Sequence, residues 1–316
     1  MTAAAVRAPW PDAAQLPPAH MVLGQAGGEN FPVASRLLPA QVRGDLMALY
    51  GWARLVDELG DNYAGDRLAA LDLAESQLRA TLAGSPPQDL HPLVATVAAT
   101  VERRGLPVQP LLDLVQANRQ DQVVKRYRTF DELRSYCALS ANPVGRTVLA
   151  IFGAATPEHV AWSDAICTGL QLVEHWQDVA EDAIVGRVYI PEPDMARFGV
   201  TPEQLVPPPA DYTHRNRRAA PGGASAECRA LMAFECGRAR LLLDEGTPLV
   251  ASLKGRLGLA VAGFLAGGHA ALDALAALDF DIYADTARPA PERFTAHFLR
   301  LVVGKARAGT HRGGPR

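Results

Sequence analysis

Residues 171–182 have the sequence Gln-Leu-Val-Glu-His-Trp-Gln-Asp-Val-Ala-Glu-Asp, which combines acidic and apolar side chains at helical spacing. Residues three or four positions apart share one face of a helix. One face of this segment is polar: Gln171, Glu174 (or His175), Asp178 and Asp182, with Glu181 beside it. The remaining face is apolar: Leu170, Leu172, Val173 and Val179. The stretch predicts a helix that packs into a core on one side and gathers carboxylates on the other.

An earlier segment, residues 54–61, repeats this design with the sequence Arg-Leu-Val-Asp-Glu-Leu-Gly-Asp. Asp57 and Asp61 project together, and Arg54 lies one turn before them. Burying unpaired carboxylates would cost several kcal/mol each. One such pair commonly marks a solvated helix face, but two pairs in otherwise apolar helices favour a shared cavity around divalent cations. Mg²⁺ suits carboxylates that leave room for water and substrate phosphate.

A di-iron bundle would also place carboxylates inside helices. That site needs paired Glu-x-x-His motifs, which this sequence lacks. Arg187 and Tyr189, just after the second acidic segment, offer a forked donor and a hydroxyl of the kind that a diphosphate requires. An ordinary surface arginine is the alternative for Arg187.

The composition favours helices throughout. Of 316 residues, 48% are hydrophobic and only 6% aromatic, and the apolar content is mostly Ala, Leu and Val, of which Ala and Leu are strong helix formers. The sequence shows no internal repeat and no alternation of strands with helices. We expect one all-α domain over residues 20–303, after a flexible arm (1–19) and before a basic tail (304–316). Helices are expected at 39–62, 66–82, 90–104, 107–128, 129–141, 144–152, 156–184, 226–245, 248–278 and 291–303, with a mobile loop at about 206–226.

Net charge and cysteine content indicate which partners and which cellular compartment to expect. A net charge of −3 gives no reason to expect nucleic acid. The four scattered cysteines indicate a reducing compartment, so we expect a cytoplasmic protein. After Glu292 the chain has no acidic residue and six arginines or lysines. This tail suits contact with anionic lipid at the inner face of a membrane, although a plain solubilising tail explains it as well.

Four segments together resemble the squalene/phytoene synthase family, in order, over about residues 29–284. Residues 54–61, with Tyr50 upstream, resemble its first aspartate-rich motif, and residues 171–182 its second. Residues 136–145, Tyr-Cys-Ala-Leu-Ser-Ala-Asn-Pro-Val-Gly, are similar to its tyrosine-to-glycine segment, and residues 186–191, Gly-Arg-Val-Tyr-Ile-Pro, follow at the family's spacing. The resemblance implies the isoprenoid synthase fold, with a central cavity between helices.

A finer resemblance concerns residues 29–39, which look like a signature of the hydroxysqualene synthases of the bacterial hopanoid pathway. It implies presqualene diphosphate as substrate and hydroxysqualene as product. Because both are apolar, it also implies neighbouring enzymes of the squalene pathway as partners at a membrane surface. Mg²⁺ is the implied cofactor, and no NADPH is expected, because water traps the final carbocation. Two alternatives stay open. One is a condensing enzyme that uses farnesyl or geranylgeranyl diphosphate, and the other is a non-catalytic relative that acts in binding or assembly.

The resemblance also assigns site residues. The implied metal ligands are Asp57, Asp61, Asp178 and Asp182. Tyr50 joins them as a catalytic residue, and Gln171 and Asn142 are our candidates for positioning the trapping water. Substrate contacts fall to Asn30, Phe31, Arg54, Val144, Gly145, Glu174, Arg187 and Tyr189. Glu174 departs from the family, whose members carry asparagine there, and the extra carboxylate can strengthen metal binding or oppose it. Asp121 matches an acidic family position, but an ion pair with Lys125 explains it nearly as well.

Overall fold

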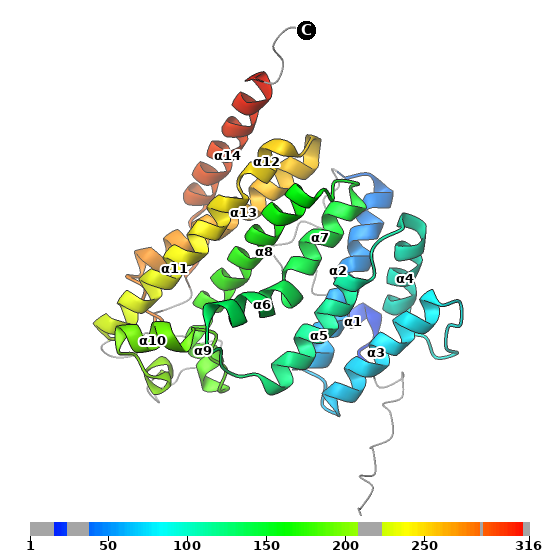
Figure 1. Cartoon of the computed structure of the whole chain (residues 1–316), viewed down its shortest axis with the longest axis horizontal. Coiled ribbons are helices and arrows are strands. Elements are labelled where there is room, and N and C mark those ends of the chain that lie inside the picture. Colours follow the sequence, from blue (N-terminus) through cyan, green and yellow to red (C-terminus); the bar gives the residue numbers. More distant parts are fainter. Residues whose placement is uncertain (1–15, 24–37, 208–222, 285–286, 312–316) are drawn as a thin grey trace, which may run out of the picture. The chain divides into compact units, whose positions relative to one another are not determined.

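The computed structural model describes residues 16–23, 38–207, 223–284 and 287–311, the last five by their backbone alone. The chain divides into two compact units, Met1–Val123 and Val124–Arg316. The described residues are mostly helical, and among them the only β pairing is one isolated bridge between Arg126 and Val188. The expected all-α class is confirmed (Figure 1).

The first unit is built around one long helix, α2. Its helices are α1 (Ala19–Leu23), α2 (Ala40–Asp61), α3 (Arg67–Leu82), α4 (Pro92–Arg104) and α5 (Gln109–Val123). The helix α2 packs against the other four. Its apolar face is fully buried at Leu55, Val56 and Leu59, and the buried Trp52 Nε1 donates to the Leu111 carbonyl oxygen over 3.0 Å. This packing fixes the rotation of α2 about its axis, and with it the direction of the acidic face.

The second unit is built around α8 in the same way. Its helices are α6 (Phe130–Ser140), α7 (Asn142–Ile151), α8 (Pro157–Gln177), α9 (Val179–Ile184), α10 (Glu192–Phe198), the 3₁₀ helix η3 (Pro202–Leu205), α11 (Ala226–Gly246), α12 (Pro248–Ser252), α13 (Gly255–Ala277) and α14 (Pro291–His311). In Figure 1, α8 lies alongside α7 and α11, and it also contacts α6 and α13. Leu172 and Trp176 of α8 are fully buried, as the apolar face of residues 171–182 predicts.

Three expected helices end or break earlier than their sequence pattern suggests. The helix expected at 156–184 is interrupted at Asp178, whose φ of −110° and ψ of 13° separate α8 from α9. The helix expected at 248–278 is divided before Gly255, whose φ of 58° is left-handed. The helix expected at 107–128 stops at Val123, because the backbone at Lys125 and Tyr127 bonds instead to Val188 and Glu192, over 2.9 and 3.0 Å. The short α1, α10 and η3 were not expected.

The remaining boundaries concern the ends and the long loop. Most of the expected arm and of the loop at 206–226 lies outside the described residues, and the single domain over 20–303 remains an expectation. The last helix was expected to stop at 303 but continues to His311, so the expected tail begins as helix. The helix α13 is long and apolar enough to cross a membrane by length and composition, and 56% of its most apolar window is buried within the protein. Such burial is typical of the core helix of a protein.

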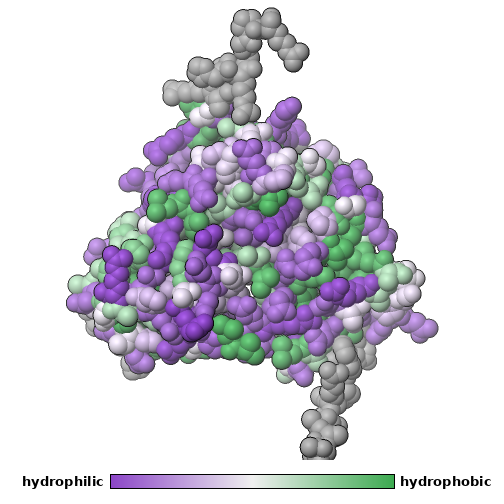
Figure 2. Space-filling model, in the orientation of Figure 1, coloured by the Kyte–Doolittle hydropathy of each residue, from purple (hydrophilic) through white to green (hydrophobic). Residues whose placement is uncertain are grey.

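The surface is mixed in character. On the face that Figure 2 shows, hydrophobic side chains form separate patches among hydrophilic ones. The large apolar side chains with high exposure include Leu241 of α11 and Leu299 and Val303 of α14, which are 70%, 55% and 47% exposed. The two on α14 are four residues apart, so they share one outward face of that helix.

Candidate functional site

The first acidic face lies on α2, in the first unit. Asp61 is exposed at the last turn of the helix, and Asp57 is half-buried one turn before it. The Asn118 amide nitrogen, on α5, donates to Asp57 Oδ1 over 3.3 Å and to the Leu114 carbonyl oxygen over 3.2 Å. Asn118 is buried, so α5 supplies a fixed donor that orients one carboxylate of the pair.

Gly60, inside this motif, is required by packing. A Cβ atom placed on it would lie 2.1 Å from Asn118 Oδ1 and 2.9 Å from Asn118 Cγ. The Gln122 side-chain amide also donates to the Gly60 carbonyl oxygen, over 3.0 Å. The glycine therefore lets α5 approach α2 closely enough for Asn118 to reach Asp57. On this helix the sequence pattern predicts a role for Asp121 but not for Asn118 or Gln122. The helix α5 ends at Val123, so Lys125 lies two residues beyond the helix that contains Asp121.

Arg54 and Tyr50 lie on the same helix, upstream of the aspartates. The Arg54 guanidinium donates to Glu58 Oε1 over 2.9 Å, and the Asn62 amide donates to Glu58 Oε2 over 2.9 Å. The Arg54 side chain is 26% exposed, and Tyr50 is buried. Glu58 thus holds Arg54 in place along α2 while part of its charge stays accessible.

The second acidic face spans α8 and α9, in the second unit. Glu174 and Asp178 are exposed, and Asp182 is half-buried. The break at Asp178 does not separate the pair, because the Asp182 amide donates to the Asp178 carbonyl oxygen over 2.8 Å. The chain then turns at Gly186, with φ of 77°, and the Arg187 amide donates back to the Asp182 carbonyl oxygen over 2.8 Å. This turn brings Arg187 beside the acidic face, as the order of residues 186–191 implied.

Aromatic rings support this face from within. The His175 and Tyr189 rings are stacked, with centroids 3.6 Å apart and planes at 14°. Tyr189 also lies against Tyr127 and Tyr136, each at 5.8 Å. These four rings are buried or nearly so. Burial, and then the charge of Arg187, lowers the pKa of His175 to about 3, so its imidazole is neutral at physiological pH. Tyr189 and Tyr136 belong to motifs identified in the sequence, and His175 enters there only as an alternative to Glu174. Tyr127, which follows the end of α5, is not predicted from the sequence.

A small enclosed space lies under the second face. Its volume is about 10 Å³, which is close to the room that one water molecule occupies. Its walls include His175, Trp176, Asp182, Arg187 and Tyr189. Asp182, Arg187 and Tyr189, three of the predicted site residues, therefore line one small space in the second unit.

The polar groups predicted for water capture also lie in this unit. Gln171 Nε2 is 3.3 Å from His175 Nε2. Asn142 is buried, and its Oδ1 accepts from the Thr168 hydroxyl over 3.0 Å. Val144 is half-buried on α7. A Cβ on Gly145 would lie 2.4 Å from Ser163 Oγ and 2.6 Å from Cys167 Sγ, so this glycine serves the close packing of α7 on α8. Asn30 and Phe31 lie outside the described residues.

The donor set fits a hard cation. Each unit presents two carboxylates four residues apart on a helix whose opposite face is buried, and these carboxylates are exposed or half-buried. Within the described residues, no three His, Cys, Asp or Glu side chains gather closely enough in one place to hold a metal ion. Two oxygen donors per face with accessible positions match Mg²⁺, which keeps several waters and takes few protein ligands.

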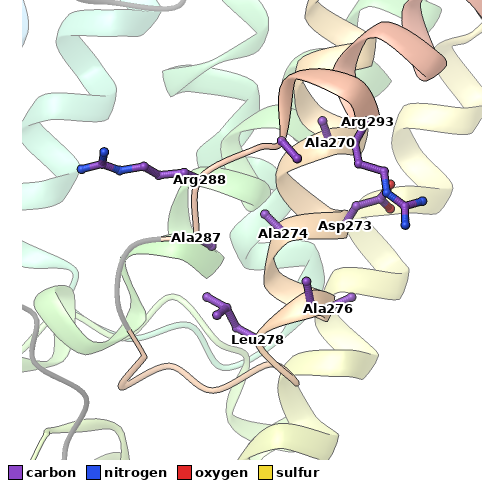
Figure 3. A pocket seen from close by; sticks show the side chains of 10 residues that line it. Ala270, Asp273, Ala274, Ala276, Leu278, Ala287, Arg288 and Arg293 are labelled. Carbon is purple, nitrogen blue, oxygen red and sulfur yellow. The ribbon is translucent and has the colours of Figure 1, made fainter.

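A larger cavity elsewhere in the second unit lacks such chemistry. It measures about 500 Å³ and lies between α13 and the start of α14 (Figure 3). Six of its ten lining residues are alanines, and its one carboxylate, Asp273, is bonded to Arg240 and His297. In Figure 3 Arg293 lies beside Asp273, whereas Arg288 extends to the other side. None of the predicted site residues lines this cavity. One contact links α8 to the wall of this cavity: the Gln177 side-chain amide donates to the carbonyl oxygen of Ala287, the residue before Arg288, over 3.1 Å.

Known proteins resemble this chain over most of its length. The family model described as squalene/phytoene synthase matches residues 25–295. The chain is 32% identical to a hydroxysqualene synthase of Sinorhizobium fredii, over 72% of this chain and 72% of that protein. It is 34% identical to a hydroxysqualene synthase of Rhodopseudomonas palustris, over 74% of each. A phytoene synthase of Arthrospira platensis is 34% identical, over 69% of this chain and 71% of its own length.

Solved structures share the fold. The crystal structure of squalene synthase HpnC from Alicyclobacillus acidocaldarius superposes with a TM-score of 0.71 and 36% identity, over 86% of this chain and 99% of that one. A dehydrosqualene synthase in complex with ligand superposes with a TM-score of 0.74, over 93% and 96% of the chains, at 20% identity, so this second likeness concerns the fold alone. The expected isoprenoid synthase fold is confirmed, and the chain belongs to the squalene/phytoene synthase family of isoprenoid synthase enzymes.

Proposed function

We propose that this enzyme ionises presqualene diphosphate with the help of Mg²⁺ and captures the resulting carbocation with water, giving hydroxysqualene and diphosphate. The observation that carries the proposal is the pair of accessible carboxylate faces, Asp57 with Asp61 and Asp178 with Asp182, each on a helix whose other face is buried. The identity to two hydroxysqualene synthases supports this substrate and product.

Asp57 with Asp61, and Asp178 with Asp182, would each offer oxygen ligands to Mg²⁺ on their own face. Bound Mg²⁺ would supply Lewis acidity and neutralise the charge of the leaving diphosphate. Asn118 keeps the Asp57 carboxylate oriented through its amide, and the backbone bond between Asp178 and Asp182 keeps the second pair in helical register. Glu174, where relatives carry asparagine, is exposed beside this pair and adds negative charge. We expect this charge to change metal affinity without replacing either aspartate.

The diphosphate is bound by cationic and hydroxyl donors. The backbone amide of Arg187 donates to the Asp182 carbonyl oxygen, which places Arg187 next to the second acidic face. The ring of Tyr189 is held by stacking on His175. Arg54 is held along α2 by Glu58, close in sequence to the first aspartates and to Tyr50. Charge-assisted hydrogen bonds of this kind are about twice as strong as neutral ones. Donors held in place before the reaction stabilise the charge that develops on the departing group.

The hydrocarbon part of the substrate needs a dry, apolar surrounding until water is admitted. Val144 on α7 is half-buried and suits such a contact, and Gly145 beside it permits the close packing of α7 on α8. Asn30 and Phe31 remain proposed substrate contacts from the resemblance alone. Gln171 and the buried Asn142 are the proposed positioning groups for the capturing water. This reaction consumes water and no reductant, so NADPH is not required.

A second candidate is a condensing enzyme that uses farnesyl or geranylgeranyl diphosphate. The 34% identity to a phytoene synthase favours it, as does the 36% identity to a structurally similar squalene synthase. A non-catalytic assembly protein is the candidate from another class. The test is to incubate the purified protein with Mg²⁺ and, separately, presqualene or farnesyl diphosphate, without NADPH, and to identify products by mass spectrometry. Consumption of farnesyl diphosphate supports condensation, and no turnover of either supports the assembly protein.

The partner proposed for α14 is an anionic lipid surface. One side of this helix is anchored to its own unit, because Lys305 Nζ donates to the Val250 carbonyl oxygen over 2.8 Å and His297 bonds to Asp273. Outside these anchors, Leu299 and Val303 are exposed and Arg300 is exposed beside them. An apolar stripe flanked by basic residues suits the boundary between lipid headgroups and acyl chains. Such a location would give the enzyme access to its apolar substrate and product.

A further inference from the structure

The side chain of His175 is buried on α8 but has a polar partner. It is 7% exposed, and its ring is stacked on Tyr189 at 3.6 Å. Its Nε2 atom lies 3.3 Å from Nε2 of Gln171, one helical turn earlier. An apolar side chain would fill the same space among aromatic rings, so a histidine needs an explanation beyond packing.

The contact with His175 determines how the side-chain amide of Gln171 is oriented. An amide nitrogen only donates hydrogen bonds, so the His175 Nε2 atom must accept, and the single proton of the neutral imidazole lies on Nδ1. With its nitrogen bonded to the ring, Gln171 turns its carbonyl oxygen Oε1 away from the ring. Within the described part of the chain, Oε1 makes no hydrogen bond. Gln171 is half-buried, so Oε1 is an oriented acceptor that remains accessible.

We infer that His175 is a positioning residue for product formation, which holds Gln171 so that its Oε1 accepts a hydrogen bond from the water that captures the carbocation. The inference rests on the proposed function. An oxygen lone pair of the water forms the new C–O bond with the cationic carbon. The resulting protonated alcohol passes its extra proton to the diphosphate released in the ionisation step. An acceptor aligned with the second O–H bond of the water points its lone pair at the cation, and orientation of this kind governs such steps.

Two substitutions separate the hydrogen bond from the ring stacking. His175→Phe keeps an aromatic ring against Tyr189 and removes the acceptor for Gln171. His175→Gln removes the ring and keeps an amide oxygen that can reach the Gln171 amide nitrogen. Both variants and the wild type are incubated with presqualene diphosphate and Mg²⁺. Diphosphate release measures ionisation, and the fraction of product recovered as hydroxysqualene measures water capture.

We expect His175→Phe to lower the fraction of product recovered as hydroxysqualene at least fivefold, whereas the rate of diphosphate release should fall by less. Alkenes or other alcohols should form in place of the missing hydroxysqualene. His175→Gln should keep the fraction closer to that of the wild type, whatever its loss in rate. Gln171→Ala should reproduce the His175→Phe product pattern, and the double variant should add nothing further, because both changes remove one interaction.

An unchanged product fraction in His175→Phe overturns the inference, because a role in packing alone would alter stability and rate but not the partition of products. So does a His175→Gln variant that loses as much of the alcohol as His175→Phe, since ring stacking would then be the cause. Failure of the wild type to convert presqualene diphosphate is a different result, and it refutes the proposed function on which the inference rests.

Discussion

Replacing Gly60 with alanine tests how the first acidic face is constructed. The new Cβ would lie 2.1 Å from Oδ1 and 2.9 Å from Cγ of Asn118, a buried side chain. Either the two helices separate, at about 1–3 kcal/mol for overpacking, or Asn118 moves and breaks its bonds to Asp57 and Leu114, at about 1–3 kcal/mol for a stranded buried amide. The gain in helix propensity from glycine to alanine returns about 1 kcal/mol. The expected net loss of unfolding free energy is therefore about 0–2 kcal/mol.

The same helix contains a matched control. Gly44 is exposed in α2, and nothing lies within 4 Å of the position its Cβ would occupy. Gly44→Ala should therefore stabilise the protein by about 0.5–1 kcal/mol. Urea unfolding followed by circular dichroism compares both variants with the wild type. The effect of Gly60→Ala should largely disappear in an Asn118→Ala background, where the clashing atoms are absent. If Gly60→Ala proves as stable as Gly44→Ala, the proposed close approach of α5 to α2 is wrong.

Three further predictions concern the second face, its buried histidine and α14. Asp178→Asn should reduce turnover of presqualene diphosphate by about 10²-fold or more and raise the Mg²⁺ concentration needed for half-maximal rate. Asp131→Asn, on an exposed position of α6, should change neither, and equal effects would contradict the ligand assignment. The pKa of His175 is lowered to about 3, by burial and by Arg187, so the unfolded chain binds a proton that the folded chain does not. Stability from this group is complete above about pH 6.5 and is lost as pH falls toward 3, by about 2 kcal/mol between pH 7 and 5. The urea midpoint of His175→Phe should therefore fall less between pH 7 and 5 than that of the wild type. An equal fall in both proteins would show that the pH dependence of stability comes from other groups. Leu299→Glu should greatly reduce co-sedimentation with vesicles that contain anionic lipid. Leu241→Glu, at the 70% exposed position on α11, should not, and equal losses would exclude α14 as the docking surface.

The sequence was informative about which residues form the faces because amphipathic periodicity reports rotation about a helix axis. Asp57 with Asp61, and Asp178 with Asp182, lie on helices whose opposite faces are buried, as residues 54–61 and 171–182 predict. Periodicity did not predict the break at Asp178, because residues on both sides keep helical spacing and the residue itself is no helix breaker.

The missed contacts depend on tertiary structure. Asn118 reaches Asp57 because Gly60 leaves room for it, and the ring of His175 stacks on Tyr189. No local pattern encodes either of these contacts. The end of α5 at Val123 is similar, since the backbone at Lys125 bonds to Val188, more than sixty residues later. Gly60 was the one available signal for Asn118, because a glycine inside an amphipathic helix often indicates close approach of another element.

Isotope labelling distinguishes capture of the carbocation by water from every other fate of the substrate. Purified protein is incubated with presqualene diphosphate and Mg²⁺ in ¹⁸O-enriched water without NADPH, and products are identified by mass spectrometry. We expect hydroxysqualene that carries ¹⁸O at its hydroxyl group, together with released diphosphate. Unlabelled alcohol, hydrocarbon products alone, or unchanged presqualene diphosphate would refute capture by water.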